Sequence, residues 1–179
     1  MAVKSALLSK IERECGNINV CFQCRKCSAG CPVAHEMDLL PSQIIHAVRL
    51  GMMEQVLKSR TIWLCASCET CTTRCPQEVD IAKVMDSLRA MAVREGIKPA
   101  VPQVRAFHAS ALQSIRMFGR MYELGMLGMM KLRTGEYMKD KDLGMKMLKK
   151  GKMKLFPTPK NVFKINRIFS RAKKMEKTE

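Results

Sequence analysis

Eight of the nine cysteines in this 179-residue sequence fall into two groups with the same internal spacing. The first group reads CFQCRKCSAGCP from Cys21, and the second reads CASCETCTTRCP from Cys65. Each cysteine of the second group lies 44 positions after its counterpart in the first, and a proline follows both groups. Three thiols at two-residue spacing, with a fourth just before a proline, are typical of sequences that bind [4Fe–4S] clusters.

Two such groups predict two clusters with crossed ligation. In chains with two runs of this kind, the fourth cysteine of each run binds the cluster that the other run holds. We therefore expect one cluster to be bound by Cys21, Cys24, Cys27 and Cys75, and the other by Cys31, Cys65, Cys68 and Cys71. This pairing requires the two clusters to lie close together, which suits the transfer of single electrons between them.

Structural zinc and disulfide bonds are the two other uses of clustered cysteines. Zinc sites favour paired CxxC arms from two places in the chain, whereas three consecutive thiols at two-residue spacing suit a cubane cluster better. A disulfide scaffold would require export and would leave an odd thiol. The sequence has no signal-peptide-like start and no run of 18 apolar residues, so we expect a cytoplasmic protein without a transmembrane segment.

The remaining sequence predicts an all-α fold. Apolar residues recur with helical periodicity, and no stretch alternates apolar and polar residues for long enough to form a sheet. Helices are expected over about residues 5–14, 38–51, 54–58, 79–94, 103–132, 141–149 and 159–175. Asp38 and Thr158 are predicted as helix N-caps. Pro99 and Pro102 mark a boundary between a cluster-binding domain, residues 1–98, and a helical extension rich in Lys and Met, residues 99–179.

The extension is strongly basic. Of the net charge of +16, residues 131–179 carry +11, from 16 Lys and Arg against five Asp and Glu. We predict that it docks onto a partner with an acidic surface, and the alternatives are a solvated charged surface or contact with an anionic membrane surface. No nucleic acid is expected as a partner, because aromatic residues are few and no recognition motif is visible.

Several residues near the cysteine groups have more than one interpretation. Cys15, outside both groups, is predicted to be a buried structural thiol. Trp63 is predicted to shield a cluster from water or to pack in the core. Arg25 and Lys26 in the first group, and Arg74 in the second, either favour cluster reduction by their charge or are simply exposed. No catalytic residue is expected, because the eight ligands leave one free thiol.

The helical segment of over thirty residues between the groups resembles that of α-helical ferredoxin domains. Such domains occur in succinate dehydrogenase, fumarate reductase, anaerobic glycerol-3-phosphate dehydrogenase and heterodisulfide reductase. The stretches CFQCRKCSAGCP, DLLPSQIIHAVRLG and IWLCASCETCTTRCP resemble most closely the C subunit of the heterodisulfide reductase of methanogenic archaea, over roughly residues 15–95. The sequence has neither a plant-type ferredoxin cysteine set nor a CCG-type repeat.

This resemblance implies an electron-transfer subunit of an oxidoreductase complex in methanogenesis. The C subunit of that complex relays single electrons between a flavin-containing, iron–sulfur partner, the A subunit, and the catalytic B subunit, which reduces the disulfide of coenzyme M and coenzyme B. The resemblance also implies an associated hydrogenase or formate dehydrogenase, reached through the flavin-containing partner. The alternative is a relay subunit of another anaerobic complex, of the glycerol-3-phosphate dehydrogenase or fumarate reductase type.

Overall fold

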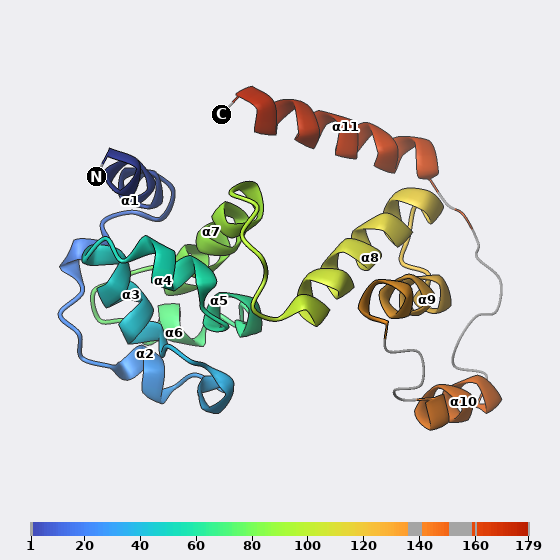
Figure 1. Cartoon of the computed structure of the whole chain (residues 1–179), viewed down its shortest axis with the longest axis horizontal. Helices are drawn as coiled ribbons and strands as arrows, with labels where there is room; N and C mark the ends of the chain where they lie inside the picture. The colour runs from blue at the N-terminus through green and yellow to red at the C-terminus, as the bar shows by residue number, and fades with distance from the viewer. Residues whose placement is uncertain (1, 136–140, 151–158, 160, 179) are drawn as a thin grey trace. The chain divides into compact units, whose positions relative to one another are not determined.

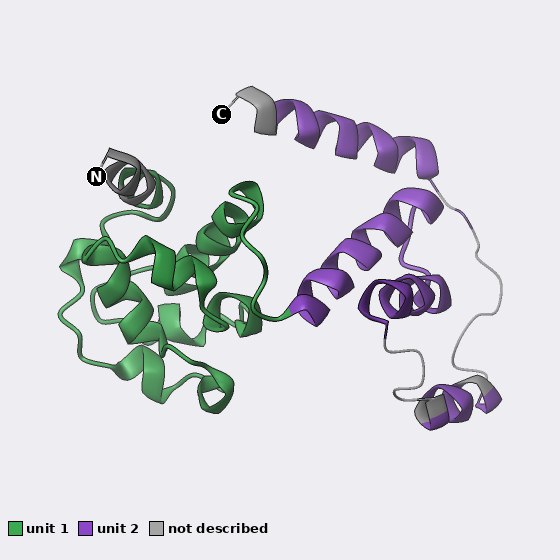
Figure 2. Cartoon of the chain, viewed as in Figure 1, with its two compact units in different colours: residues 1–101 green, residues 102–179 purple. Residues whose placement is uncertain are grey.

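The computed structural model describes residues 2–135, 141–150, 159 and 161–178. In these residues every regular element is a helix, with no strand, as the sequence predicted. The chain divides into two compact units, Met1–Val101 and Pro102–Glu179 (Figure 2), and this division lies three residues after the predicted boundary. None of the helices in the described ranges combines the length and apolar character needed to cross a membrane.

The first unit contains seven α-helices and two short 3₁₀ helices among its described residues (Figure 1). In chain order they are α1 (Ala2–Cys15), η1 (Ile18–Val20), α2 (Lys26–Ala29), η2 (Ala34–Glu36), α3 (Pro41–Arg49), α4 (Met53–Lys58), α5 (Thr61–Leu64), α6 (Thr70–Thr73) and α7 (Ile81–Arg94). Both cysteine groups lie in this unit: the first two cysteines of each group precede α2 or α6, the third lies in that helix, and the fourth follows it.

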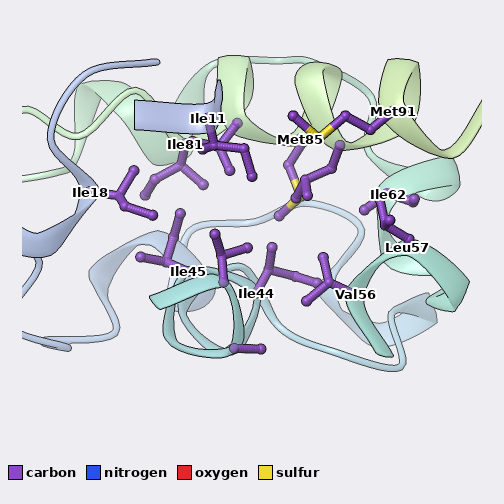
Figure 3. Packing of buried hydrophobic residues seen from close by; sticks show 14 of the residues in the cluster. Ile11, Ile18, Ile44, Ile45, Val56, Leu57, Ile62, Ile81, Met85 and Met91 are labelled. Carbon is purple, nitrogen blue, oxygen red and sulfur yellow. The ribbon is translucent and has the colours of Figure 1, made fainter. Parts of the chain in front are cut away.

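The longest helices of this unit surround an aliphatic core (Figure 3). Ile11 of α1, Ile44 of α3, Val56 of α4 and Leu88 of α7 are fully buried in it. Burying side chains of this size stabilises a fold by about 1.5–3 kcal/mol each relative to exposure. Helix α7 packs against α1, α4, α5 and α6, so it fixes the segments on either side of the second cysteine group.

Asp38 does not cap the helix that follows the first cysteine group, so that prediction is wrong. The N-cap of α3 is Leu40. The Asp38 carboxylate instead accepts hydrogen bonds from the backbone N–H groups of Arg60, at 2.7 Å, and Thr61, at 3.0 Å. It therefore accepts hydrogen bonds from N–H groups at the start of α5, and it connects the segment after the first cysteine group to the segment that leads into the second.

The second unit contains α8 (Pro102–Phe118), α9 (Glu123–Thr134), α10 (Lys141–Lys149) and α11 (Val162–Thr178). The single long helix predicted over residues 103–132 is wrong, because Gly119, with φ at +72°, ends α8. The backbone N–H of Tyr122 then donates to the buried Ser114 Oγ at 2.9 Å, which folds α9 back along α8. Helix α11 begins at Val162 rather than at residue 159, and Thr158 lies outside the described residues.

Candidate metal centre

The two cysteine loops repeat the same backbone conformation. Gln23 and Arg25 in the first loop have φ angles of 58° and 63°, and their counterparts Ser67 and Glu69 have 48° and 58°. Left-handed backbone is uncommon for residues other than glycine, so its recurrence at positions 44 apart shows a structural repeat. Left-handed residues beside right-handed ones turn successive N–H groups inward, which suits an anionic group such as a thiolate-bound iron–sulfur cluster.

The two repeats meet at α2 and α6, which pack against each other. Gly30 and Arg74 occupy equivalent positions at the ends of these helices, and the Arg74 side chain lies over Gly30. A Cβ atom at position 30 would lie 2.5 Å from Arg74 Nη1 and 2.8 Å from Arg74 Cδ. This junction brings together the residues that directly precede Cys31 and Cys75, the fourth cysteines of the two groups.

One hollow brings together cysteines from both groups. Cys31 of the first group lines it together with Cys65, Cys68 and Cys71 of the second. The other residues around this hollow are mostly apolar: Val33, Met37, Pro41, Ala66, Glu69, Thr70, Ala82 and Met85. These four thiols are the set that crossed ligation predicts for one cluster.

The thiols of this hollow differ in how readily they ionise. Burial raises the pKa of Cys65, and the nearby Cys31 thiolate adds to this shift. Burial, followed by the charge of Cys65, raises the pKa of Cys71 to about 11. Hydrogen bonds to Thr70 lower the pKa of the exposed Cys68. Because metal binding requires thiolates, loading of this site must displace protons from the buried thiols.

The first three cysteines form a second set of sulfur donors. Cys27 is buried, and its burial raises the pKa of its thiol against an opposing hydrogen bond to Ser28. The charge of Cys21 also raises this pKa, so these two thiols lie within electrostatic reach of each other. Gln23 Nε2 donates to Cys21 Sγ at 3.4 Å. Cys24 is exposed and therefore marks the outer edge of this set.

Cys75, the fourth ligand predicted for the first set, is half-buried against the core. Its Sγ accepts a hydrogen bond from the backbone N–H of Val79 at 3.4 Å. An N–H···S bond of this kind stabilises a thiolate and is one of the determinants of iron–sulfur potentials.

Two arginines that sequence reasoning missed hold the first cysteine of each group. Arg49 Nη1, from α3, donates to the carbonyl oxygen of Cys21 at 2.7 Å. Arg89, from α7, donates to the carbonyl oxygens of Cys65, at 2.9 Å, and Ile62, at 2.7 Å. The signal in the sequence was an arginine in the helix that follows each group, but spacing alone does not show which carbonyl it reaches.

Trp63, Cys15 and Arg25 differ in how deeply they are buried. Trp63 is buried in the core, and its Nε1 has no hydrogen-bond acceptor among the described residues. Cys15 is half-buried against the core, with its Sγ 3.4 Å from Ser87 Oγ, so it is less buried than predicted. Arg25 is exposed.

The donor atoms fit an iron–sulfur group. Both sets consist of cysteine sulfur, the ligand that [4Fe–4S] clusters use. In the part of the chain that the structure describes, no three Cys, His, Asp or Glu side chains converge on a single metal-ion position. Donor type and the apolar lining of the hollow therefore agree with the cluster chemistry predicted from the spacing.

Comparison with known proteins supports this chemistry. Residues 17–79, which include all eight grouped cysteines, match the family model of the 4Fe-4S dicluster domain. The chain is 32% identical over 85 residues to the iron-sulfur C subunit of the CoB–CoM heterodisulfide reductase of Methanopyrus kandleri, an alignment that covers 48% of this chain and 44% of that protein. The resemblance and the all-α ferredoxin-type fold predicted from the sequence are thus confirmed for this region.

Two further relatives are similar to about half of this chain. The C2 subunit of the H2/formate:CoB–CoM heterodisulfide,ferredoxin reductase of Methanococcus maripaludis is 33% identical over 104 residues, which is 55% of this chain and 56% of that protein. The C subunit of the ferredoxin:CoB–CoM heterodisulfide reductase of Methanosarcina acetivorans is 41% identical over 78 residues, which is 44% of this chain and 31% of that protein. The chain thus spans about half the length of the curated relatives that it matches.

Proposed function

We propose that this chain is an iron–sulfur electron-transfer subunit of a heterodisulfide reductase complex. It holds two [4Fe–4S] clusters, each of which accepts and releases one electron at a time. One cluster is bound by Cys21, Cys24, Cys27 and Cys75, and the other by Cys31, Cys65, Cys68 and Cys71. The observation that carries the proposal is the hollow that Cys31 of the first group shares with three cysteines of the second.

The protein's own residues prepare both sites. The left-handed residues of the two loops suit anionic clusters, and Arg49 and Arg89 hold the first cysteine of each loop in position. Met37 and Met85 line the second site with apolar surface that excludes water. Solvent exposure and hydrogen bonding to sulfur are both determinants of cluster potential. The surroundings of the two sites therefore influence the reduction potentials of the clusters as well as their binding.

Two partners belong to this proposal. One contains flavin and iron–sulfur clusters, and the other is the catalytic subunit, which reduces the CoM–CoB disulfide. A hydrogenase or formate dehydrogenase would supply electrons through the flavin-containing partner, in line with the name of the Methanococcus maripaludis relative. The chain itself carries no catalytic site, because its grouped cysteines serve as ligands. A cytoplasmic location fits this function, since thiols remain reduced there.

The second unit offers a surface for docking these partners. Helix α11 exposes Phe163, Ile168 and Met175, with exposed fractions of 93%, 60% and 67%. Lys164, Arg167 and other cations lie on the same helix. Exposed apolar side chains on a positively charged helix favour a partner with an acidic, partly apolar surface.

Metal analysis and ligand variants test the proposal. Anaerobically prepared chain should contain about eight irons and about eight acid-labile sulfides, with little zinc. Cys75→Ala should damage the cluster that the first loop holds, and Cys31→Ala the one that the second loop holds, while the control Cys15→Ser should retain both. Electron paramagnetic resonance of the reduced variants distinguishes the two clusters. Stoichiometric zinc without sulfide would refute the proposal, and damage confined to the mutated loop's own cluster would refute crossed ligation.

A further inference from the structure

The two cysteine loops differ in charge although they share a backbone. Arg25 in the first loop and Glu69 in the second occupy equivalent left-handed positions, and both side chains are exposed. Lys26 follows Arg25, whereas the neutral Thr70 follows Glu69. Residues 21–31 therefore carry a net charge of +2, and residues 65–75 carry none. The repeat thus presents two different electrostatic surfaces.

Exposed apolar side chains lie beside the basic loop. Phe22 is 59% exposed, and Val20, on the other side of Cys21, is 41% exposed. Leu50 and Met52, which follow Arg49, are 61% and 44% exposed. We call these four residues, together with Arg25 and Lys26, the first-loop face. Exposed aromatic and methionine side chains beside arginine are characteristic of protein–protein interfaces.

Two observations place the residues after α3 next to the first loop. Arg49, whose side chain reaches the carbonyl oxygen of Cys21, directly precedes Leu50. Met52 lines one hollow together with Gln23 and Arg25 of the loop. The remaining residues around this hollow are Leu40, Ser42, Gln43, His46, Ala47 and Gln55. Among the described residues that line the hollow, none carries a carboxylate, so its charged groups can only be positive.

The second loop instead has carboxylates around its exposed cysteine. Cys68 is exposed like its counterpart Cys24. Glu69 is its direct neighbour, and Ser67 on its other side donates a hydrogen bond to Asp86 Oδ1 at 2.9 Å. Two carboxylates therefore flank the most exposed sulfur of this loop. A partner that is complementary to the first-loop face would be repelled here.

We propose that the first-loop face is the docking surface for the electron-accepting partner, and that this partner contacts it with acidic side chains around an apolar centre. Cys24 at the edge of the face places the sulfur ligand of one cluster next to the partner. The inference rests on the proposed relay function and adds to it which of the two clusters faces the electron-accepting partner. Oxidation of the first-loop cluster by one electron is balanced by one-electron reduction of the partner's redox group.

The charges of the first-loop face favour electron transfer to the partner from the first-loop cluster. Cations close to a cluster stabilise its reduced, more negative state, and net charge is one of the determinants of cluster potential. Arg25, Lys26 and Arg49 lie around the first three cysteines, whereas Arg89 beside the second group is partly balanced by Asp86, with Arg89 Nη1 3.5 Å from Asp86 Oδ1. Electrons should therefore accumulate at the first-loop cluster and leave from there.

Charge reversal on the full, cluster-loaded chain tests the docking surface. The double variant Arg25→Glu/Lys26→Glu is compared with Lys83→Glu, an exposed lysine on α7 outside the first-loop face. Stopped-flow absorbance follows oxidation of the reduced chain by the purified disulfide-reducing subunit of a heterodisulfide reductase. We expect the second-order rate constant at low salt to fall by about tenfold or more in the double variant and to stay near the wild-type value in the control.

Zero-length carbodiimide cross-linking supplies a readout that does not depend on turnover. Lys26 should form amide bonds with Asp or Glu of the same partner, and its cross-linked peptide should be absent when the flavin-containing subunit replaces that partner. Unchanged rate constants in the double variant, or Lys26 cross-links to the flavin-containing subunit only, would overturn the inference and leave the relay function intact. A chain that lacks clusters, or that exchanges electrons with neither partner, would instead refute the proposed function.

Discussion

Replacement of Asp38 by alanine should destabilise the cluster-binding unit by more than a surface position usually does. The Asp38 carboxylate accepts hydrogen bonds from the backbone N–H groups of Leu39, Arg60 and Thr61 and lies 2.8 Å from Thr61 Oγ1. Thr61 is fully buried, so its N–H group cannot turn to water when the acceptor is lost. The Arg60 and Leu39 groups lie near the surface and are more easily rehydrated.

The size of the effect follows from these contacts. Hydrogen bonds to charged groups contribute about 1.5–3 kcal/mol each, and a buried donor left unpaired costs about 1–3 kcal/mol. The Thr61 hydroxyl keeps a partner, because it also donates to the Leu39 carbonyl oxygen at 2.6 Å. The Thr61 N–H group and one partly hydrated donor therefore account for most of the effect, and the free energy of unfolding should fall by about 2–4 kcal/mol. A unit of about 100 residues should then lose about 10 °C or more in its thermal midpoint.

The measurement is thermal unfolding of the anaerobic, cluster-loaded chain at one fixed scan rate, followed by circular dichroism and by cluster absorbance. Glu36→Ala is the matched control, because this exposed carboxylate pairs with the neighbouring His35 and lies outside the network around Asp38. Equal, small shifts in Asp38→Ala and Glu36→Ala would refute the reasoning. Cluster absorbance should be lost together with helicity, since Asp38 joins the segments that carry the two groups.

The stability difference between the wild type and Asp38→Ala depends on pH with a defined sign. Partial burial raises the pKa of Asp38, but the hydrogen bonds from Arg60 and Thr61 outweigh it and lower the pKa overall. A lowered pKa gives a contribution that is present above the unfolded-state pKa and is lost only as the pH falls through the folded-state pKa. The difference between the wild type and Asp38→Ala should therefore be constant between about pH 6 and pH 8, and a decline across this window would contradict it.

Two further predictions concern contacts that hold the cysteine loops. Arg89→Met should lower the free energy of unfolding by about 1–3 kcal/mol and speed loss of the second-loop cluster, because the Cys65 carbonyl oxygen loses its donor. The measurement is the chelator-driven decay of each cluster signal. Lys83→Met, on the exposed side of the same helix, is the control. Ser42→Ala should lower the free energy of unfolding in urea by about 1–3 kcal/mol, since the buried Ser28 hydroxyl, which donates to Ser42 Oγ at 2.8 Å, loses its acceptor. An unchanged urea midpoint would contradict this prediction.

The features that the sequence predicted well depend on neighbouring residues. The spacing of the cysteines gives the repeat directly, and the apolar stripe of α7 is visible as a pattern of three and four. Crossed ligation also follows from the spacing of the two runs, and it stays a prediction. These predictions needed no knowledge of distant contacts.

The features that the sequence did not predict depend on distant partners. Asp38 has the residue type and position of a cap, but its acceptor oxygens reach donors 22 and 23 residues away. Arg49 and Arg89 act over 28 and 24 residues, so no local pattern identifies the carbonyl groups that they bind. The break at Gly119 was missed because a glycine within a continuous apolar stripe is compatible with both a helix and a turn.

The contact between Gly30 and Arg74 makes the two halves of the repeat mutually dependent. Gly30 has φ at −96°, which any residue can adopt, so the backbone does not require glycine there. A Cβ atom there would nevertheless force the Arg74 side chain to shift, because that side chain occupies the space over Gly30. Equivalent positions that meet in this way compete for one volume, so a large side chain is accommodated on one side only. If the repeat arose by duplication, its halves could not stay identical once one of them acquired an arginine here. A change at either position restricts what the other can become, so positions 30 and 74 should vary as a pair among homologues.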